Sequence, residues 1–152
     1  LMTDQLSHID ENGRASMVDV SGKPQVRRVA VAEGFFEAAP DTIGAILDGD
    51  LPKGEALAVA RVAGITAAKM CDRLIPLCHP LPLDHVTVSF EHAQDDRIRI
   101  EASATVTART GIEMEALTAV SIAALTLWDM TKAIDKGLRI SCIRIIKKEK
   151  DV

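Results

Sequence analysis

The chain has 152 residues and a net charge of −4, and 47% of its residues are apolar but only 3% aromatic. Its length suits a single domain with a full hydrophobic core, which we place at residues 17–148. The net negative charge of the chain repels phosphate backbones, and few aromatic side chains are present for base stacking. Nucleic acid is therefore not an expected partner. Three cysteines without paired spacing, and no apolar leader, predict a cytoplasmic protein with reduced thiols and no membrane segment.

The first third of the chain is expected to form two strands and one short helix. Residues 1–16 are polar and contain the turn signal Asn12-Gly13, so we expect a mobile lead-in. Short β-favouring runs at residues 17–20 and 26–36 predict strands on either side of a Gly- and Pro-containing turn. A short helical pattern follows and stops at an Asp-Gly-Asp turn.

A long, Ala-rich helix is predicted over residues 52–73. Pro52 suits its first turn, because proline lacks an N–H and its backbone angle is already helical. Gly64 lies near the middle, where glycine costs about 1 kcal/mol relative to alanine. This position therefore indicates a close approach by another element.

A rigid loop and a β-hairpin come next. Residues 74–82 hold three prolines and cannot form a regular helix or a central strand, so this loop presents Cys78 and His79 in a fixed conformation. Alternation of apolar and polar residues over 86–90 and 97–107 predicts a hairpin with one buried face.

Residues 110–132 are predicted to form the central helix. Thr110 and Glu113 have the T-x-x-E spacing of a capping box, which marks a helix start. The uncharged run that follows is apolar on all sides, so we expect a helix that is buried all round, yet it is too short to span a membrane. Asp129 and Lys132, three residues apart, share one face near its end.

A last strand is expected over residues 138–146, and residues 149–152 are a short tail. The apolar phase of this strand shifts between Cys142 and Ile143, which indicates a bulge. The elements run β-α-β-β-α-β and predict an α+β fold, a ferredoxin-like antiparallel sheet with two long helices packed on one face. The other face of the sheet, or the outer sides of the helices, is then exposed in one chain. Association into a homo-oligomer would cover this surface.

The sequence holds none of the common phosphate-binding loops or nucleophile motifs. Cys71, Cys78 and His79 lack the close pairs that zinc sites use, so we expect no metal. Two interpretations of His79 stay open. It either hydrogen-bonds within its loop or is held in place to contact a ligand.

Several charged residues also have two interpretations. Asp129 and Lys132 form either a helical ion pair worth about 0.3–0.5 kcal/mol or an acid/base pair tuned for proton transfer. Glu113 has a structural role in the capping box, whereas Glu115 has none. The cations are either solvated or prepared for an anion: Arg27, Arg28, Lys53, Lys69, Lys147 and Lys148.

The chain resembles the cyclic pyranopterin monophosphate synthases of molybdenum cofactor biosynthesis. The resemblance runs from about Ser7 to Lys148, in the blocks SHIDENGRASMVDVS, KGEALAVARVAGITAAK, LIPLCHPL, TGIEMEALTAVSIAALTLWDMTKA and IRII. It implies a ferredoxin-like fold and a homohexamer built as a trimer of dimers, with the active site at a dimer interface.

The resemblance also implies a lyase reaction without an organic cofactor. The substrate is (8S)-3′,8-cyclo-7,8-dihydroguanosine 5′-triphosphate, and the products are cyclic pyranopterin monophosphate and pyrophosphate. Such chemistry needs cations for the phosphates and an acid/base pair for the rearrangement.

By the same resemblance, Asp129 and Lys132 are the acid/base centre. The implied substrate contacts are Arg27, Lys53, Lys69, Leu77, Cys78, His79, Glu113, Met114, Glu115 and Lys148. Arg28 is the alternative to Arg27. Many family members continue into a glycine- and lysine-rich tail, whereas this chain ends at KKEKDV, so a solvated end is the other interpretation of Lys147 and Lys148.

A non-catalytic alternative comes from another class of protein. A ferredoxin-like module that binds a phosphorylated ligand would need the same cations but would have no use for Asp129.

Overall fold

The computed structural model describes residues 7–151. The strands and helices, in chain order, are β1 Val26–Glu37, α1 Pro40–Asp48, α2 Ala56–Lys69, α3 Cys71–Leu74, β2 His85–Gln94, β3 Arg97–Ala108, α4 Glu113–Thr131 and β4 Arg139–Lys150. Residues 1–6 of the predicted lead-in and Val152 of the predicted tail lie outside the described range.

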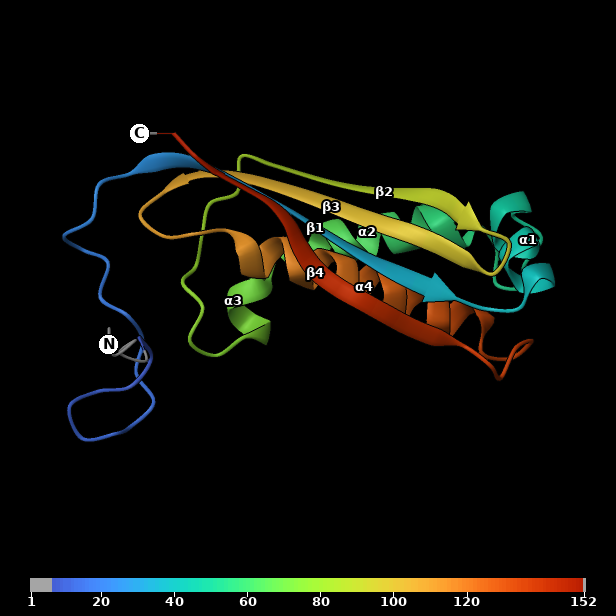
Figure 1. The fold of residues 1–152 in the computed structure, drawn as a ribbon, viewed down its shortest axis with the longest axis horizontal. Coiled ribbons are helices and arrows are strands. Elements are labelled where there is room, and N and C mark those ends of the chain that lie inside the picture. Colours follow the sequence, from blue (N-terminus) through green and yellow to red (C-terminus); the bar gives the residue numbers. More distant parts are fainter. Residues whose placement is uncertain (1–6, 152) are drawn as a thin grey trace.

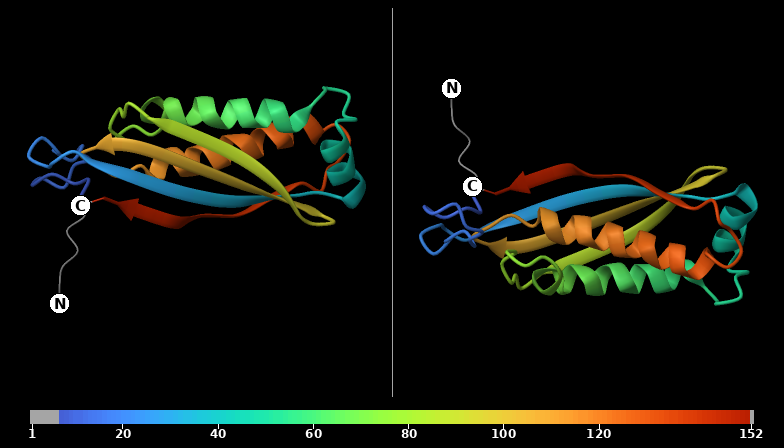
Figure 2. Two further views of the ribbon diagram at one scale, coloured as in Figure 1. Left: turned by 90° about the horizontal axis from the view of Figure 1, so that it is seen from above. Right: turned by 90° about the horizontal axis from the view of Figure 1, so that it is seen from below.

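The four strands form one antiparallel sheet in the order β2-β3-β1-β4. Helices α2 and α4 lie side by side across one face of this sheet, and α1 lies near one end (Figure 1, Figure 2). This arrangement confirms the predicted α+β, ferredoxin-like fold. Within the described residues, no helix combines the length and the apolar character needed to cross a membrane.

The core lies between the sheet and the two long helices. Alternation along β3 buries Ile98, Ile100 and Ala102 on the helix side. Ala119 and Ala123 of α4 are fully buried. A Cβ at Gly64 of α2 would lie 2.9 Å from the Ala119 carbonyl oxygen, which confirms the predicted close approach at that glycine.

The outer face of the sheet carries charged pairs. Glu33 is only 6% exposed and accepts hydrogen bonds from Arg99 Nε at 2.7 Å and Arg144 Nε at 2.9 Å. The two long helices, in contrast, expose large apolar side chains to solvent in the single chain: Val59 and Val62 of α2, and Leu125 and Trp128 of α4. The prediction that the central helix is buried all round is therefore wrong for one chain.

Two predicted helix starts are also wrong. Pro52 precedes α2, because Gly54 has a φ of 100° and this left-handed backbone interrupts any helix before Glu55. Helix α4 begins at Glu113 without a side-chain cap. Glu113 forms an ion pair with Lys148 of β4 instead of a capping box with Thr110.

The ends of the predicted strands differ as well. Residues 17–20 do not form the expected strand. Strand β4 runs to Lys150, beyond the predicted end at residue 146, and Lys148 is paired with Ala30. The predicted bulge is confirmed, because the register shifts opposite Gly34 and Cys142 has a φ of 53° there.

Candidate active site at the two ends of helix α4

Helix α4 carries predicted site residues at both of its ends. Glu113, Met114 and Glu115 lie in its first turn, and Asp129 lies in its last. An α-helix rises about 1.5 Å per residue, so Glu113 and Asp129 are about 24 Å apart along its axis. One chain therefore presents two separate groups of candidate residues.

The C-terminal cluster consists of Lys53, Asp129 and Lys132. Lys132 Nζ lies 2.7 Å from Asp129 Oδ1, which confirms the predicted neighbours. Lys53 Nζ donates to Asp129 Oδ2 at 3.3 Å and to the Asp129 carbonyl oxygen at 3.1 Å. These contacts, first that of Lys132 and then that of Lys53, hold the pKa of the Asp129 carboxyl below its usual value. All three side chains are about half exposed, and Lys132 lines a cavity of about 370 Å³.

The N-terminal cluster consists of Leu77, Cys78, Glu113, Met114, Glu115 and Lys148. Its polar part is the ion pair of Glu113 with Lys148. Burial acts to raise the pKa of Glu113, but the hydrogen bond and charge of Lys148, together with the charge of Arg28, outweigh it and lower that pKa. The side chains of Arg28, Glu113 and Lys148 line a cavity of about 180 Å³.

The structure separates the two arginine alternatives. Arg28 lies on the helix side of β1, and its guanidinium donates to the Ala108 carbonyl oxygen at 3.3 Å beside this cavity. Arg27 is exposed and pairs with Asp151 at 3.4 Å. Within one chain, Arg28 thus lines the same cavity as Glu113 and Lys148, and Arg27 does not line it.

The buried part of this cluster holds Cys78 and Glu115. Glu115 is 2% exposed, and its Oε2 has no hydrogen-bond partner in the part of the chain that the structure describes. Burial raises its pKa to about 7. Burial also raises the pKa of Cys78 to about 12. Leu77, Cys78 and Met114 line a largely apolar cavity of about 540 Å³. A carboxyl with this pKa can exchange a proton at neutral pH.

His79 is held by the N-terminal segment rather than by its own loop. Its Nε2 lies 2.7 Å from the Val18 carbonyl oxygen. A carbonyl can only accept, so Nε2 carries the proton in this bond and Nδ1 is left to contact a ligand. The histidine therefore fixes residues 17–20 beside the proline-rich loop.

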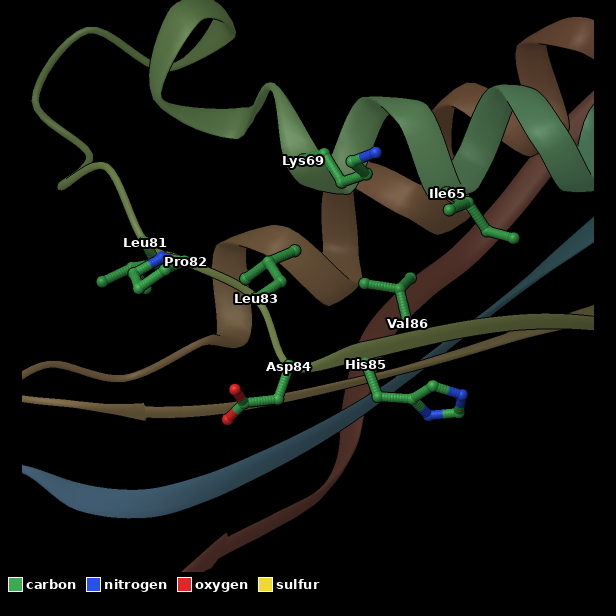
Figure 3. Close-up of a pocket in the computed structure, with 8 residues that line it drawn as sticks. All are labelled: Ile65, Lys69, Leu81, Pro82, Leu83, Asp84, His85 and Val86. Carbon is green, nitrogen blue, oxygen red and sulfur yellow. The ribbon is translucent and has the colours of Figure 1, made fainter.

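Lys69 belongs to neither cluster. It is the last residue of α2 and lines a cavity of about 410 Å³ above the start of β2. Figure 3 shows Lys69 and Ile65 projecting from the helix over Leu83 and Val86, while the Asp84 carboxylate points away from the lysine amine.

The position of Cys71 beside Cys78 was not predicted from the sequence. Its thiol lies 3.9 Å from that of Cys78 and 3.4 Å from Thr118 Oγ1. The two cysteines are seven residues apart, and only the turn made by α3 and the following loop brings them together. No local spacing rule carries that information.

Comparisons with known proteins identify the family of this chain. The MoaC family model matches residues 17–151. A protein from Thermomicrobium roseum named cyclic pyranopterin monophosphate synthase is 53% identical over 145 residues, covering 95% of this chain and 87% of its own length. Proteins of that name from Novosphingobium aromaticivorans, and with the suffix 1 from Mycobacterium tuberculosis, are each 54% identical. They cover 94% and 95% of this chain, and 90% and 84% of their own lengths. The chain belongs to the MoaC family.

Proposed function

We propose that this chain converts the 3′,8-cyclised, 7,8-dihydro form of guanosine 5′-triphosphate into cyclic pyranopterin monophosphate and pyrophosphate in the cytoplasm. The observation that carries this proposal is Asp129 held between Lys53 and Lys132 at the end of α4. Two ammonium groups offer charge for a polyphosphate, and the carboxylate keeps them in place while the site is empty of substrate.

The residues of the two clusters suit different parts of this reaction. In the C-terminal cluster, Lys132 is the acid that donates a proton, because its amine is charged and already oriented by Asp129. In the N-terminal cluster, Glu115 has a pKa of about 7 and suits a base or proton carrier at neutral pH. Met114 lines the apolar cavity in which we place the ring system, His79 has Nδ1 left for a ligand, and Arg28 and Lys148 contribute positive charge.

The separation of the clusters favours a site shared between two chains. Their cavities have no lining residue in common, and about 24 Å of helix lies between them. A site that uses both clusters on one small substrate must take the N-terminal cluster from one protomer and the C-terminal cluster from another. The exposed Val62 and Leu125 support such association, and we propose a hexamer built as a trimer of dimers.

Turnover by the purified chain tests the reaction directly. We expect the parent to form cyclic pyranopterin monophosphate and pyrophosphate in equal amounts. Lys132→Ala and Asp129→Ala should lower turnover by roughly 10²–10⁴-fold, as loss of a general acid or base does. Their far-UV circular dichroism should match the parent, because both side chains are more than half exposed.

Asp48→Ala, which removes an exposed carboxylate at the end of α1, is the control and should keep parental turnover. Full activity in both Lys132→Ala and Asp129→Ala would refute the assignment. Substrate binding without products in the parent would favour the non-catalytic module.

A further inference from the structure

Three potential metal ligands meet beneath the first turn of α4. Cys71 at the start of α3, Cys78 in the proline-rich loop and Glu115 of α4 each bring one ligand atom within 4.8 Å of the other two. Cys71 and Glu115 are each 2% exposed. The sequence led us to expect no metal because the cysteines are not closely spaced, but the fold brings them together.

The distance between the two thiols fits a shared ion. Two thiolates on a tetrahedral zinc, each about 2.3 Å from the metal, lie about 3.8 Å apart. The Cys71 and Cys78 sulfurs are 3.9 Å apart. A disulfide needs about 2.05 Å, so closing that bond would require the sulfurs to approach by almost 2 Å.

The carboxylate of Glu115 supplies an independent observation. Among residues 7–151, its Oε2 is buried without a hydrogen-bond partner, whereas buried Glu33 on the sheet binds two arginines. A buried carboxylate oxygen without a partner is costly. Asp72 and Glu113 add negative charge near Glu115.

We propose that Cys71, Cys78 and Glu115 bind a thiophilic divalent cation, and that the ion is zinc. Two sulfurs and one carboxylate oxygen are ligands that zinc accepts, and three protein ligands leave a fourth position for water or a substrate atom. The Glu115 carboxylate oxygen lies within 4.8 Å of both sulfurs. Thr118 Oγ1, at 3.4 Å, is placed to donate to the Cys71 sulfur and orient it.

This inference does not depend on the proposed reaction, because metal binding is measured without substrate. A bound ion would hold Glu115 in its ionised form, so the proton exchange proposed for Glu115 applies to the metal-free chain. Cys78 lines the apolar cavity of the N-terminal cluster, so the proposed ion would lie beside the space that we assign to substrate.

The test is a titration of the chelator-treated, reduced full chain with Zn²⁺ in competition with a chromophoric chelator, and with Co²⁺ followed by absorption. We expect one ion per chain, and a cobalt spectrum with a thiolate charge-transfer band and the intense visible bands of tetrahedral coordination. Cys71→Ser and Glu115→Gln should weaken zinc binding by roughly 100-fold or more, since losing even an outer partner of a ligand costs 10–100-fold. Cys142→Ser removes the exposed cysteine outside the cluster and should bind like the parent.

Parental binding no tighter than that of Cys71→Ser would overturn the proposal, as would a cobalt spectrum without the thiolate band. Loss of two of the three free thiols on air oxidation, with zinc present in excess, would show that the pair forms a disulfide instead. If Cys71→Ser fails to fold, the cobalt spectra of the parent and of Cys142→Ser still decide the question.

Discussion

The two ends of helix α4 hold carboxylates in opposite environments. At the N-terminal end, Glu115 is buried, its Oε2 has no hydrogen-bond partner among the described residues, and its pKa is raised to about 7. At the C-terminal end, Asp129 is exposed between two lysines, and its pKa is lowered. Burial has the largest effect on the pKa of Glu115, and the two lysines have the largest effect on the pKa of Asp129. A single helix therefore provides both a carboxyl that exchanges protons at neutral pH and one that stays ionised there.

The difference follows from what packs against each end. The first turn of α4 lies under the proline-rich loop and α3, which exclude water from Glu115. In the last turn, Asp129 faces the loop before α2, from which Lys53 donates to its carboxylate. Because of this contrast, we propose that the two clusters act in different parts of one reaction, and each of the following variants tests one side of it.

The largest effect on stability is expected from Glu115→Gln in the chelator-treated protein. The folded pKa of Glu115 is raised to about 7 from an unfolded value near 4.5, so its charge destabilises the fold above pH 7, and this cost disappears below pH 4.5. At pH 8 the variant should have a free energy of unfolding higher than the parent by about 3 kcal/mol, at ~1.4 kcal/mol per pKa unit. Near pH 4 the two should agree. Urea unfolding at both pH values measures the difference, and an equal effect at both would contradict the burial argument.

Glu113→Gln is the matched control in the same turn. The pKa of Glu113 is lowered by Lys148, so its ion pair stabilises the fold above the unfolded pKa, and this stability is lost as pH falls through the folded pKa. The variant should therefore be less stable than the parent at pH 8, opposite in sign to Glu115→Gln. Any difference between Glu113→Gln and the parent should shrink on acidification.

Lys148→Ala should have the smallest effect on stability. Its side chain is 65% exposed, and exposed ion pairs contribute about 0–1 kcal/mol. We expect a loss of less than about 1 kcal/mol at pH 8 and low salt, and less in high salt because mobile ions screen the pair. Chemical unfolding at two salt concentrations checks this expectation. A loss of several kcal/mol would show that Lys148 holds β4 in place.

The fold could be predicted because its signals are local. Alternation along β3 and the uncharged run of α4 appear directly in the sequence, and the spacing of Asp129 and Lys132 fixes their contact within one helix. The glycine at position 64 marked the crossing of α2 and α4, because a side chain would meet the Ala119 carbonyl group.

The errors occurred where contacts between distant parts of the chain compete with local signals. The capping box failed because Glu113 binds Lys148, 35 positions further along the chain. The exposed Leu125 and Trp128 look like core residues in the sequence, since a periodic pattern does not distinguish a domain core from a surface that another chain covers. The meeting of Cys71 with Cys78 depends on the turn through α3, which has no sequence signature of its own.

Mixing two inactive variants tests directly whether the two ends of α4 act together across two chains. Asp129→Ala lacks the C-terminal cluster, and Glu115→Gln lacks the N-terminal one. When the two chains are coexpressed with separate tags, half of the sites in a mixed dimer pair two intact clusters. Random assembly of dimers then restores about one quarter of the parental turnover, if each site takes one cluster from each protomer. If mixed oligomers that contain both tags recover no turnover, the shared site is contradicted. Both clusters would then act within a single chain.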